Sequence, residues 1–399
     1  MPIFLHFLLH LMRYGRLLSF LLTGGITTSW FAATGMLLLN RHRFQRLSRI
    51  AIEPDERETL PTLSVLVPAC NEVATLERAM QSLLEIDYPS MEIIAVNDRS
   101  TDGTGALLER LAAANPRLRV RHVTRLPAGW LGKNHALHIA SQEATGEWLL
   151  FTDADVVYTP DALLRAVAYA RRVGADHLVV FPRIDTRDFW ERLFASYFSL
   201  MLLLRSRIWD VSDPRRSAYF GFGAFNMVRA SAYHAFGGHG ALAMEVADDT
   251  KLGKVVKRHG FRSELVDGSD LLSVRWVVGF QGVMQCLTKN AFAGFDFSMP
   301  RMLIGVFGLL LTAVYPLAVL ILFAPGRWLA VGALLGMMSG ASTMRRVSDA
   351  ECQYGLCYPL AALMLGYIIL HSTWLACTRQ GIVWRGTLYP LDELKRGIV

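Results

Sequence analysis

The sequence predicts an α/β fold, with a Rossmann-like, mostly parallel sheet flanked by helices, together with transmembrane and interfacial helices. Two observations support this prediction. Residues 60–270 alternate between short apolar runs of strand-like composition and longer segments with helical periodicity, an order typical of parallel sheets. Long apolar stretches lie outside this range, near both ends of the chain. We therefore expect one α/β domain and several membrane-associated segments.

Four runs have the length and composition of buried strands: 63–68, 91–96, 118–123 and 147–151. A helical pattern follows the first run, with Leu76, Met80 and Leu83 on one face. Further helices are expected at 102–114 and 133–144. Because strands joined by helices run parallel with right-handed crossovers, their carboxyl ends should meet at one edge of the sheet.

The longest apolar stretches match the thickness of a bilayer. Of the 399 residues 52% are hydrophobic, and residues 17–39 carry no charge. Arginines follow directly, which favours a cytoplasmic position for the next segment. Three more stretches lie at 302–324, 328–344 and 358–377. An even number of spans conflicts with the basic residues of the tail, so 328–344, the shortest stretch, need not cross fully, and the side of the tail stays open.

These features divide the chain into five expected parts: a membrane anchor with a basic flank (1–49), the α/β domain (50–275), an interfacial segment (276–300), transmembrane helices (301–378) and a basic tail (379–399). Residues 189–209 and 276–297 are apolar and contain or adjoin basic residues, as expected for helices that lie in the membrane interface. The alternative is that both are ordinary core helices of a large domain.

The charge and the cysteines restrict the possible partners and the compartment. A net charge of +7 on a membrane protein indicates attraction to anionic lipid. No nucleic-acid-binding motif is present, so no nucleic-acid partner is expected. The five cysteines include no C-x-x-C pair, which argues against a zinc site and against a disulfide framework. We therefore expect an integral membrane protein whose α/β domain lies in the cytoplasm.

The most informative motif is Thr152-Asp153-Ala154-Asp155, which ends the apolar run 149–151. Side chains two apart in an extended chain leave on the same face, so both carboxylates should project from the end of a strand. At about 4 Å they repel by roughly 4 kcal/mol at an effective dielectric of 20. A Mg²⁺ or Mn²⁺ ion that also holds a diphosphate would relieve this repulsion. The alternative is a loop in which one aspartate caps the next helix.

Polar residues also follow two of the other expected strands. Asn71 and Glu72 come after the run 63–68, and Asp98 comes after the run 91–96. Since open α/β sheets bind ligands at the carboxyl ends of their strands, these residues should line one crevice together with the aspartate pair. The alternative for each is local turn chemistry.

Together these motifs resemble those of family 2 glycosyltransferases with a GT-A fold, over residues 62–295. Residues 67–72 are similar to the opening nucleotide-binding strand of that family, 96–104 to its second signature, and 152–155 to its D-x-D motif. The resemblance implies that Asp98 contacts a uracil base and that Asp153 and Asp155 hold a divalent metal. It implies a nucleotide-sugar site formed by Pro68, Asn71, Glu72, Asp98, Asp153 and Ala154.

Residues 245–249 lie where the family has its Glu-Asp pair. The resemblance implies that Asp249 is the catalytic base, with Asp248, which replaces the glutamate of the family, as the other candidate. The alternative is that both only cap the helix that follows. Lys133 could add positive charge near the phosphates of the donor, and the alternative is a solvated lysine at a helix start.

Two further stretches resemble the acceptor side of the family. Residues 221–226 are similar to its acceptor loop, which implies acceptor contacts by Gly223 and Ala224. Arg275 and Trp276 are similar to the end of the Q-x-x-R-W motif of polysaccharide synthases and are the other acceptor candidates. Leu272 stands at the glutamine position, which weakens a processive interpretation.

Residues 130–136 resemble the membrane-bound branch of the family that contains hopene-associated and carotenoid glycosyltransferases and, more distantly, ceramide glucosyltransferases. The resemblance implies inverting, metal-dependent transfer of one sugar from a nucleotide-diphosphate sugar, a UDP-sugar, to a lipid hydroxyl at a bacterial inner membrane. Two alternatives are a processive polysaccharide synthase and a non-catalytic membrane protein that binds nucleotide sugars.

Overall fold

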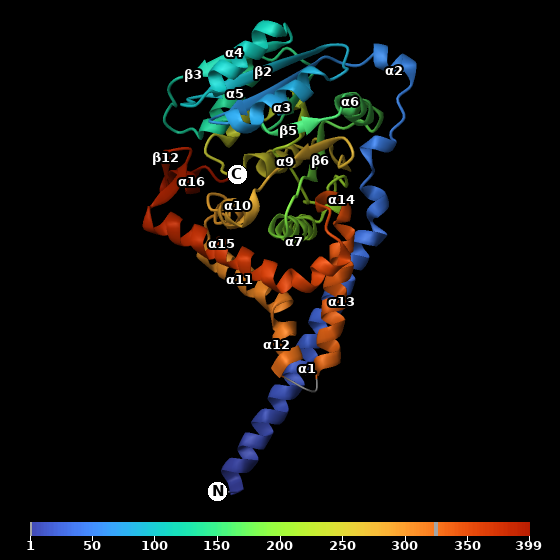
Figure 1. Cartoon of the computed structure of the whole chain (residues 1–399), viewed down its shortest axis with the longest axis vertical. Coiled ribbons are helices and arrows are strands. Elements are labelled where there is room, and N and C mark those ends of the chain that lie inside the picture. Colours follow the sequence, from blue (N-terminus) through green and yellow to red (C-terminus); the bar gives the residue numbers. More distant parts are fainter. Residues whose placement is uncertain (1, 323–325) are drawn as a thin grey trace. The chain divides into compact units, whose positions relative to one another are not determined.

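The structure is a computed structural model that describes residues 2–322 and 326–399 (Figure 1). Two sets of segments form separate compact units. The first, called here the helical unit, contains residues 1–41, 186–205 and 277–373. The second, called here the sheet unit, contains residues 42–185, 206–276 and 374–399. Every candidate site residue belongs to the sheet unit.

The helical unit contains these helices: α1 (Pro2–Leu39), α7 (Phe189–Ser206), α10 (Gly279–Gln285), α11 (Met299–Ala313), α12 (Tyr315–Leu322), α13 (Arg327–Thr343), α14 (Arg345–Ser348) and α15 (Tyr358–Thr378). By length and composition, two segments could cross a membrane, Arg13–Leu39 and Cys352–Thr378. A third span is possible if α11 and α12, bent by 41° at their junction, act as one. The last part of the predicted stretch 302–324 lies outside the described residues.

Small residues let α13 pack closely against α1. A Cβ atom at Gly332 would lie 2.9 Å from the Thr27 side chain, and one at Gly336 would lie 2.7 Å from the Cβ of Trp30. Glycines four apart share one helix face, so this face of α13 is flat enough for another helix backbone to approach. The Thr27 hydroxyl also donates a hydrogen bond to the Leu329 carbonyl, at 2.8 Å. Packing of this kind holds helices together where lipid provides no hydrophobic drive.

One predicted helix is only partly present. The stretch 276–297 is α-helical only over Gly279–Gln285, and turns follow it. Asp296 and Phe297 have positive φ angles of 50° and 53°, which no α-helix accommodates. The apolar composition indicated a longer helix than this backbone forms.

The sheet unit is built on a seven-stranded sheet in the order β3-β2-β1-β4-β8-β6-β9. The strands are β1 (Leu63–Ala69), β2 (Met91–Asp98), β3 (Leu118–Val123), β4 (Trp148–Phe151), β6 (His177–Phe181), β8 (Asn226–Arg229) and β9 (Ser263–Asp267). Only β8 runs antiparallel to its neighbours. This arrangement confirms the predicted mostly parallel α/β sheet and its first four strands.

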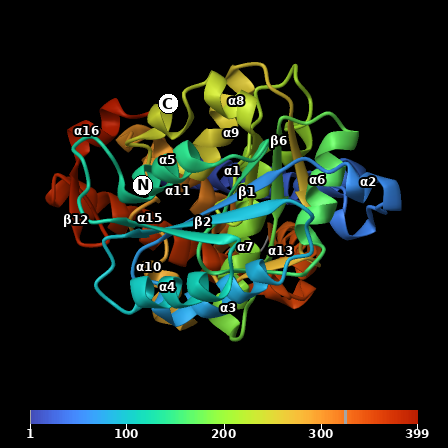
Figure 2. The ribbon, with the colours of Figure 1, turned by 90° about the horizontal axis from the view of Figure 1, so that it is seen from above.

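Helices cover both faces of the sheet (Figure 2). One face packs against α3 (Val73–Leu84), α4 (Thr104–Ala114) and α6 (Ala162–Arg172), and the other against α5 (Gly132–Glu143), α8 (Ala230–Ala235) and α9 (Asp248–Arg258). Side chains alternate between the two cores: Val65 packs on the first face and Leu66 on the second. The alternation follows from the two-residue period of a strand, and both faces are apolar because both are buried.

Two smaller sheets complete the unit. One has the order β5-β10-β7, formed by Val156–Tyr158, Leu272–Val274 and Arg183–Ile184. The other is a hairpin of β11 (Gly381–Trp384) and β12 (Thr387–Pro390), followed by α16 (Leu391–Arg396). Residues 381–396, in the range expected to be a basic tail, are therefore folded. The short helix α2 (Pro54–Glu58) precedes β1.

A buried histidine joins three strands of the main sheet. His177 on β6 is fully buried, and its ring nitrogens bond the Ser263 hydroxyl at 2.8 Å and the Asn226 side-chain oxygen at 2.5 Å. Burial disfavours the imidazolium form and lowers the pKa of His177 to about 4. The folded protein therefore holds this histidine in its neutral form at neutral pH.

We predict that the sheet unit loses stability in mild acid through His177. An unfolded chain binds a proton at this side chain near its ordinary pKa of 6.5, whereas the folded protein binds it only near pH 4. The stabilisation is thus complete above pH 6.5 and is lost as the pH falls toward 4, by roughly 2 kcal/mol between pH 7 and pH 5. Thermal unfolding in detergent should show a smaller acid-dependent drop in Tm for His177→Gln than for wild type. An equal drop in both proteins would contradict the assignment.

Candidate active site

The candidate site lies at the carboxyl ends of the central strands. From β1 the chain passes to β2 on one side, and after β3 it returns to β4 on the other side of β1. The helix α3 that leaves β1 packs on one face of the sheet, and α5, which leads into β4, packs on the other. The strand order therefore reverses between β1 and β4, and such a switch point leaves an open crevice where α/β proteins bind ligands.

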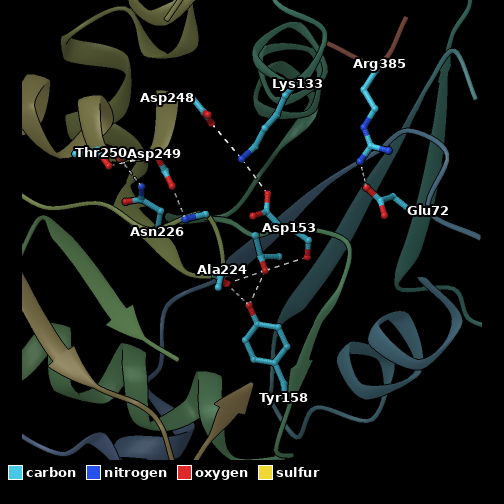
Figure 3. A network of polar contacts seen from close by, with 12 residues as sticks. Glu72, Lys133, Asp153, Tyr158, Ala224, Asn226, Asp248, Asp249, Thr250 and Arg385 are labelled. Atoms are coloured by element: carbon cyan, nitrogen blue, oxygen red, sulfur yellow. Dashed lines mark hydrogen bonds and ion pairs between the residues drawn. The ribbon is translucent and has the colours of Figure 1, made fainter. Parts of the chain in front are cut away.

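Lys133, whose side chain is 19% exposed, connects two acidic segments at this point (Figure 3). The Lys133 ammonium lies 2.9 Å from Asp153 Oδ1, after β4, and 3.3 Å from Asp248 Oδ2, at the start of α9. Burial alone would favour the neutral amine, but Asp153, Asp248 and Asp249 outweigh it and raise the pKa of Lys133. Lys133 is the second residue of α5, so the positive end of that helix faces the same acidic groups. The side chain is therefore no solvated lysine at a helix start.

Asp248 and Asp249 form the first turn of α9. Ala247 is the N-cap residue. Asp249 Oδ1 accepts a hydrogen bond from the Thr250 amide in the first turn, at 2.7 Å, and its Oδ2 accepts one from the Gly223 amide, at 2.9 Å, so this carboxylate both binds the helix start and contacts the loop before β8. Burial raises the pKa of both carboxyl groups, that of Asp248 to about 6. A buried carboxylate with a raised pKa can accept a proton near neutral pH, which is the property that a general base needs.

A second set of acidic side chains consists of Asp155 and two carboxylates that act on it, those of Asp153 and Glu72. Burial, together with the charges of Asp153 and Glu72, raises the pKa of Asp155 to about 7. A divalent cation would remove this penalty, because it stabilises the charged form of every carboxylate near it. Within residues 2–322 and 326–399, no group of three or more His, Cys, Asp or Glu side chains is arranged to hold a metal ion. One or two carboxylates are nevertheless the usual protein ligands of Mg²⁺, with substrate phosphates and water completing the shell, so Asp153 and Asp155 fit such an ion.

The loops after β1 and β2 are bound to each other. Asn71, in a left-handed conformation with φ 56°, accepts a hydrogen bond from the Thr101 amide at 2.8 Å. Asp98 is buried and receives two hydrogen bonds from its neighbour Arg99, at 2.7 and 2.9 Å. The Asn71 side chain thus joins two loops that are distant in sequence rather than closing a local turn, and the Asp98 carboxylate already has a cationic partner. Glu72 forms an ion pair with Arg385 of the β11–β12 hairpin.

The candidate acceptor residues separate into two places. The Gly223 carbonyl accepts a hydrogen bond from the Asp153 amide at 2.9 Å, and a Cβ atom at Gly223 would lie 2.4 Å from Asp153 Oδ2. Ala224 is buried, and its carbonyl accepts the hydroxyl groups of Thr152 and Tyr158, both at 2.9 Å. Gly223 therefore contacts Asp153 directly, whereas the hydrogen bonds of Ala224 are with Thr152 and Tyr158.

Arg275 and Trp276 follow β10 in the smaller sheet. Val274 pairs with Val156 in antiparallel register, so Arg275 continues the strand opposite Asp155. Pro68 lies in β1, one residue before the strand ends, and Ala154, between the two aspartates in sequence, is buried.

A small pocket contains residues that sequence reasoning did not single out. Its lining is formed by Lys133, Leu137, Phe151, Thr152, Asp153, Gly223, Asn226, His239, Asp248, Asp249 and Leu252. Asn226 donates a hydrogen bond to the Asp249 carbonyl at 3.0 Å and bonds His177 through its oxygen. His239 is buried, and burial, with the charge of Lys133, lowers its pKa to about 3. Asn226 ends the 221–226 stretch and could have been suspected, but nothing in the sequence near His239 or Arg385 indicated a place in the site.

Comparisons with known proteins point to one family for the sheet unit. Residues 64–237 match the family described as Glycosyl transferase family 2. The 4,4'-diaponeurosporenoate glycosyltransferase of Staphylococcus haemolyticus is 25% identical over 279 residues, covering 68% of this chain and 72% of that protein. The beta-monoglucosyldiacylglycerol synthase of a Nostoc species is 28% identical over 238 residues, 58% of this chain, and the match spans about half (46%) of that relative's length.

A solved structure shares the fold. The mannosyltransferase PcManGT from Pyrobaculum calidifontis, in complex with GDP-Man and Mn²⁺, aligns with a TM-score of 0.56 and 20% identity, covering 88% of this chain and 99% of that one. At this identity the likeness shows the fold alone. The fold, the family match and the two relatives agree with the family resemblance found in the sequence. The chain therefore has a GT-A-like fold, and its residues 64–237 match the glycosyltransferase family 2 domain.

Proposed function

We propose that this glycosyltransferase is an inverting, metal-dependent enzyme that moves one sugar from a UDP-sugar to the hydroxyl group of a membrane lipid. The observation that supports this most is the double ion pair of Lys133, which brings the D-x-D aspartate Asp153 and the Asp248-Asp249 pair to one pocket. Transfer needs a group that stabilises a departing diphosphate and a base for the acceptor hydroxyl. The pocket has candidates for both functions.

We assign the leaving-group side to Asp153, Asp155 and Lys133. A divalent cation bound by the two aspartates would neutralise the charge that develops on the nucleotide diphosphate. The Lys133 ammonium and the amino end of α5 add positive charge on the same side, without a change in protonation. Asp153 lies two residues after the end of β4, and the hydrogen bond from its amide to the Gly223 carbonyl holds this loop in place.

We assign the proton acceptor to Asp249. Its backbone carbonyl is held by Asn226, and its carboxylate is held by the Gly223 amide. Removal of the hydroxyl proton makes the acceptor oxygen a stronger nucleophile, and attack opposite the departing diphosphate inverts the anomeric carbon. Asp248, paired with Lys133, is the less suitable base because protonation would break that ion pair.

A lipid acceptor is proposed from two independent facts. The chain contains at least two segments that are apolar and long enough to cross a membrane. The two relatives described above are named for a carotenoid acid and a diacylglycerol glycolipid. The uridine base is proposed from the family resemblance of the β1 and β2 motifs.

The proposed function is tested by product analysis. Detergent-purified protein should be incubated with Mn²⁺, a panel of nucleotide sugars and a bacterial lipid extract, and the lipids examined by mass spectrometry. We expect one lipid class to gain the mass of a single sugar residue. Long polymeric products would support the processive alternative instead, and products formed only on water or soluble sugars would contradict a lipid acceptor.

Two substitutions should separate metal binding from proton removal. Asp155→Asn should abolish the dependence of UDP binding on Mn²⁺, because it removes a charged ligand of the cation. Asp249→Asn should leave Mn²⁺-dependent UDP binding within about twofold of wild type and lower kcat by roughly 10²- to 10⁴-fold, the usual contribution of a general base.

Calorimetry of UDP binding and single-sugar transfer are the two measurements. Asp270→Asn is the matched control, since Asp270 is exposed and bonds only Ser48 among the described contacts. Retained metal dependence in Asp155→Asn would exclude the metal assignment. Loss of UDP binding in Asp249→Asn equal to its loss of transfer would indicate a structural role for that residue.

A further inference from the structure

The β11–β12 hairpin has an arginine where its turn favours other residues. The strands pair in register from Gly381 with Pro390 to Trp384 with Thr387, so Arg385 and Gly386 form a two-residue turn. Both turn residues have positive φ angles, 50° and 78°. Turns of this kind prefer Asn-Gly, because a residue with a Cβ atom and a long side chain is strained in the left-handed region by about 1–2 kcal/mol. An arginine held in such a conformation suggests a use for its side chain.

The hairpin contacts three segments that border the candidate site. Arg385 forms the ion pair with Glu72, which follows β1. The Thr387 hydroxyl accepts a hydrogen bond from Arg99, after β2, at 3.2 Å. The hydroxyl group of Tyr389, a buried residue, accepts the backbone N–H of Gly132, the first residue of α5, at 3.2 Å. These are the loops to which the sequence motifs assigned the nucleotide.

The guanidinium group of Arg385 could exchange its partner, the Glu72 carboxylate, for another anion. Its side chain is 40% exposed and that of Glu72 is 26% exposed, so solvent reaches this ion pair, which is drawn in Figure 3. An exposed ion pair contributes little to stability, usually less than about 1 kcal/mol. A diphosphate offers a guanidinium group two or more anionic oxygens in a planar, bidentate arrangement.

On the basis of the proposed function, we infer that the β11–β12 hairpin forms an outer wall of the donor site and that Arg385 binds a phosphate of the nucleotide. In the unliganded protein its guanidinium neutralises Glu72. When the nucleotide diphosphate binds, Arg385 exchanges the Glu72 carboxylate for a phosphate oxygen, while Thr387 and Tyr389 keep the hairpin fixed to the loops beneath it. A segment more than 300 residues from β1 in sequence thereby completes the nucleotide site.

The test uses a substitution that suits the turn better than the natural residue. Arg385→Asn removes the cation and places asparagine before Gly386, the preferred sequence for this turn. A loss of binding in this variant cannot then be attributed to a disrupted hairpin. Arg385→Lys retains the charge without the planar guanidinium. Arg379→Asn, which removes an exposed arginine just before the hairpin, is the matched control.

Binding of UDP and of GDP to the purified full-length protein with Mn²⁺ should be measured by calorimetry, and binding of the corresponding nucleoside by displacement of the bound diphosphate. For the diphosphate that wild type binds, we expect Arg385→Asn to weaken affinity by roughly 10- to 100-fold and Arg385→Lys by less. Nucleoside affinity should change less than twofold. The donor KM should rise, with kcat at saturating donor nearly unchanged.

Other outcomes overturn the inference in distinct ways. Unchanged diphosphate affinity in Arg385→Asn would remove Arg385 from the site but leave the proposed glycosyl transfer intact. An equal loss of diphosphate and nucleoside affinity would show that Arg385 shapes the base pocket and binds no phosphate. Absence of binding of either diphosphate to wild type would contradict the proposed function itself, and this inference with it.

Discussion

The site depends on one cation, the ammonium group of Lys133, which lies among three carboxylates. Asp153, Asp248 and Asp249 come from the end of β4 and the start of α9, and burial raises the pKa of the last two. Without a positive charge between them, these groups would repel one another at low dielectric and take up protons. Breaking one partner of such a cluster is costly because the remaining charges stay buried and uncompensated. Lys133 therefore allows two acidic segments with different chemical roles to share one small pocket.

The backbone around this cluster leaves no room for side chains at two positions. A Cβ atom at Gly221 would lie 1.8 Å from the Asp249 carbonyl oxygen, and one at Gly223 would lie 2.4 Å from Asp153 Oδ2. The loop before β8 can reach both aspartates only because these residues are glycines. The antiparallel course of β8, between β4 and β6, brings this loop over the end of β4, and Asn226 at its start joins the loop to Asp249 and His177. The antiparallel strand β8 thus positions the loop that contacts Asp153 and Asp249.

Much of the sheet and part of the site could be predicted from the sequence, for reasons visible in particular residues. The runs at 63–68, 91–96, 118–123 and 147–151 are β1 to β4 because strands buried on both faces are continuously apolar, and the polar residues after them mark the strand ends. The pairing of Lys133 with Asp248, 115 residues later, is a tertiary contact with no local signal. The same holds for Arg385, in a segment that its basic composition indicated was a tail, and for His177, which has the apolar neighbours of any core strand. In 276–297, composition overestimated the helix because an apolar run does not specify where the backbone turns: the α-helix ends at Gln285, and turns follow it.

The central claim is that Asp153 and Asp155 hold a metal-bound diphosphate on one side of Lys133, with Asp249 on the other. The most direct measurement is a crystal structure of the protein with UDP and Mn²⁺, in which anomalous scattering locates the metal. The account predicts a manganese peak within coordination distance of Asp153 or Asp155, bridged to the diphosphate, with the Asp249 carboxylate free to receive an acceptor hydroxyl. A manganese ion bound instead between Asp248 and Asp249, or a nucleotide bound away from the β1–β4 crevice, would contradict it.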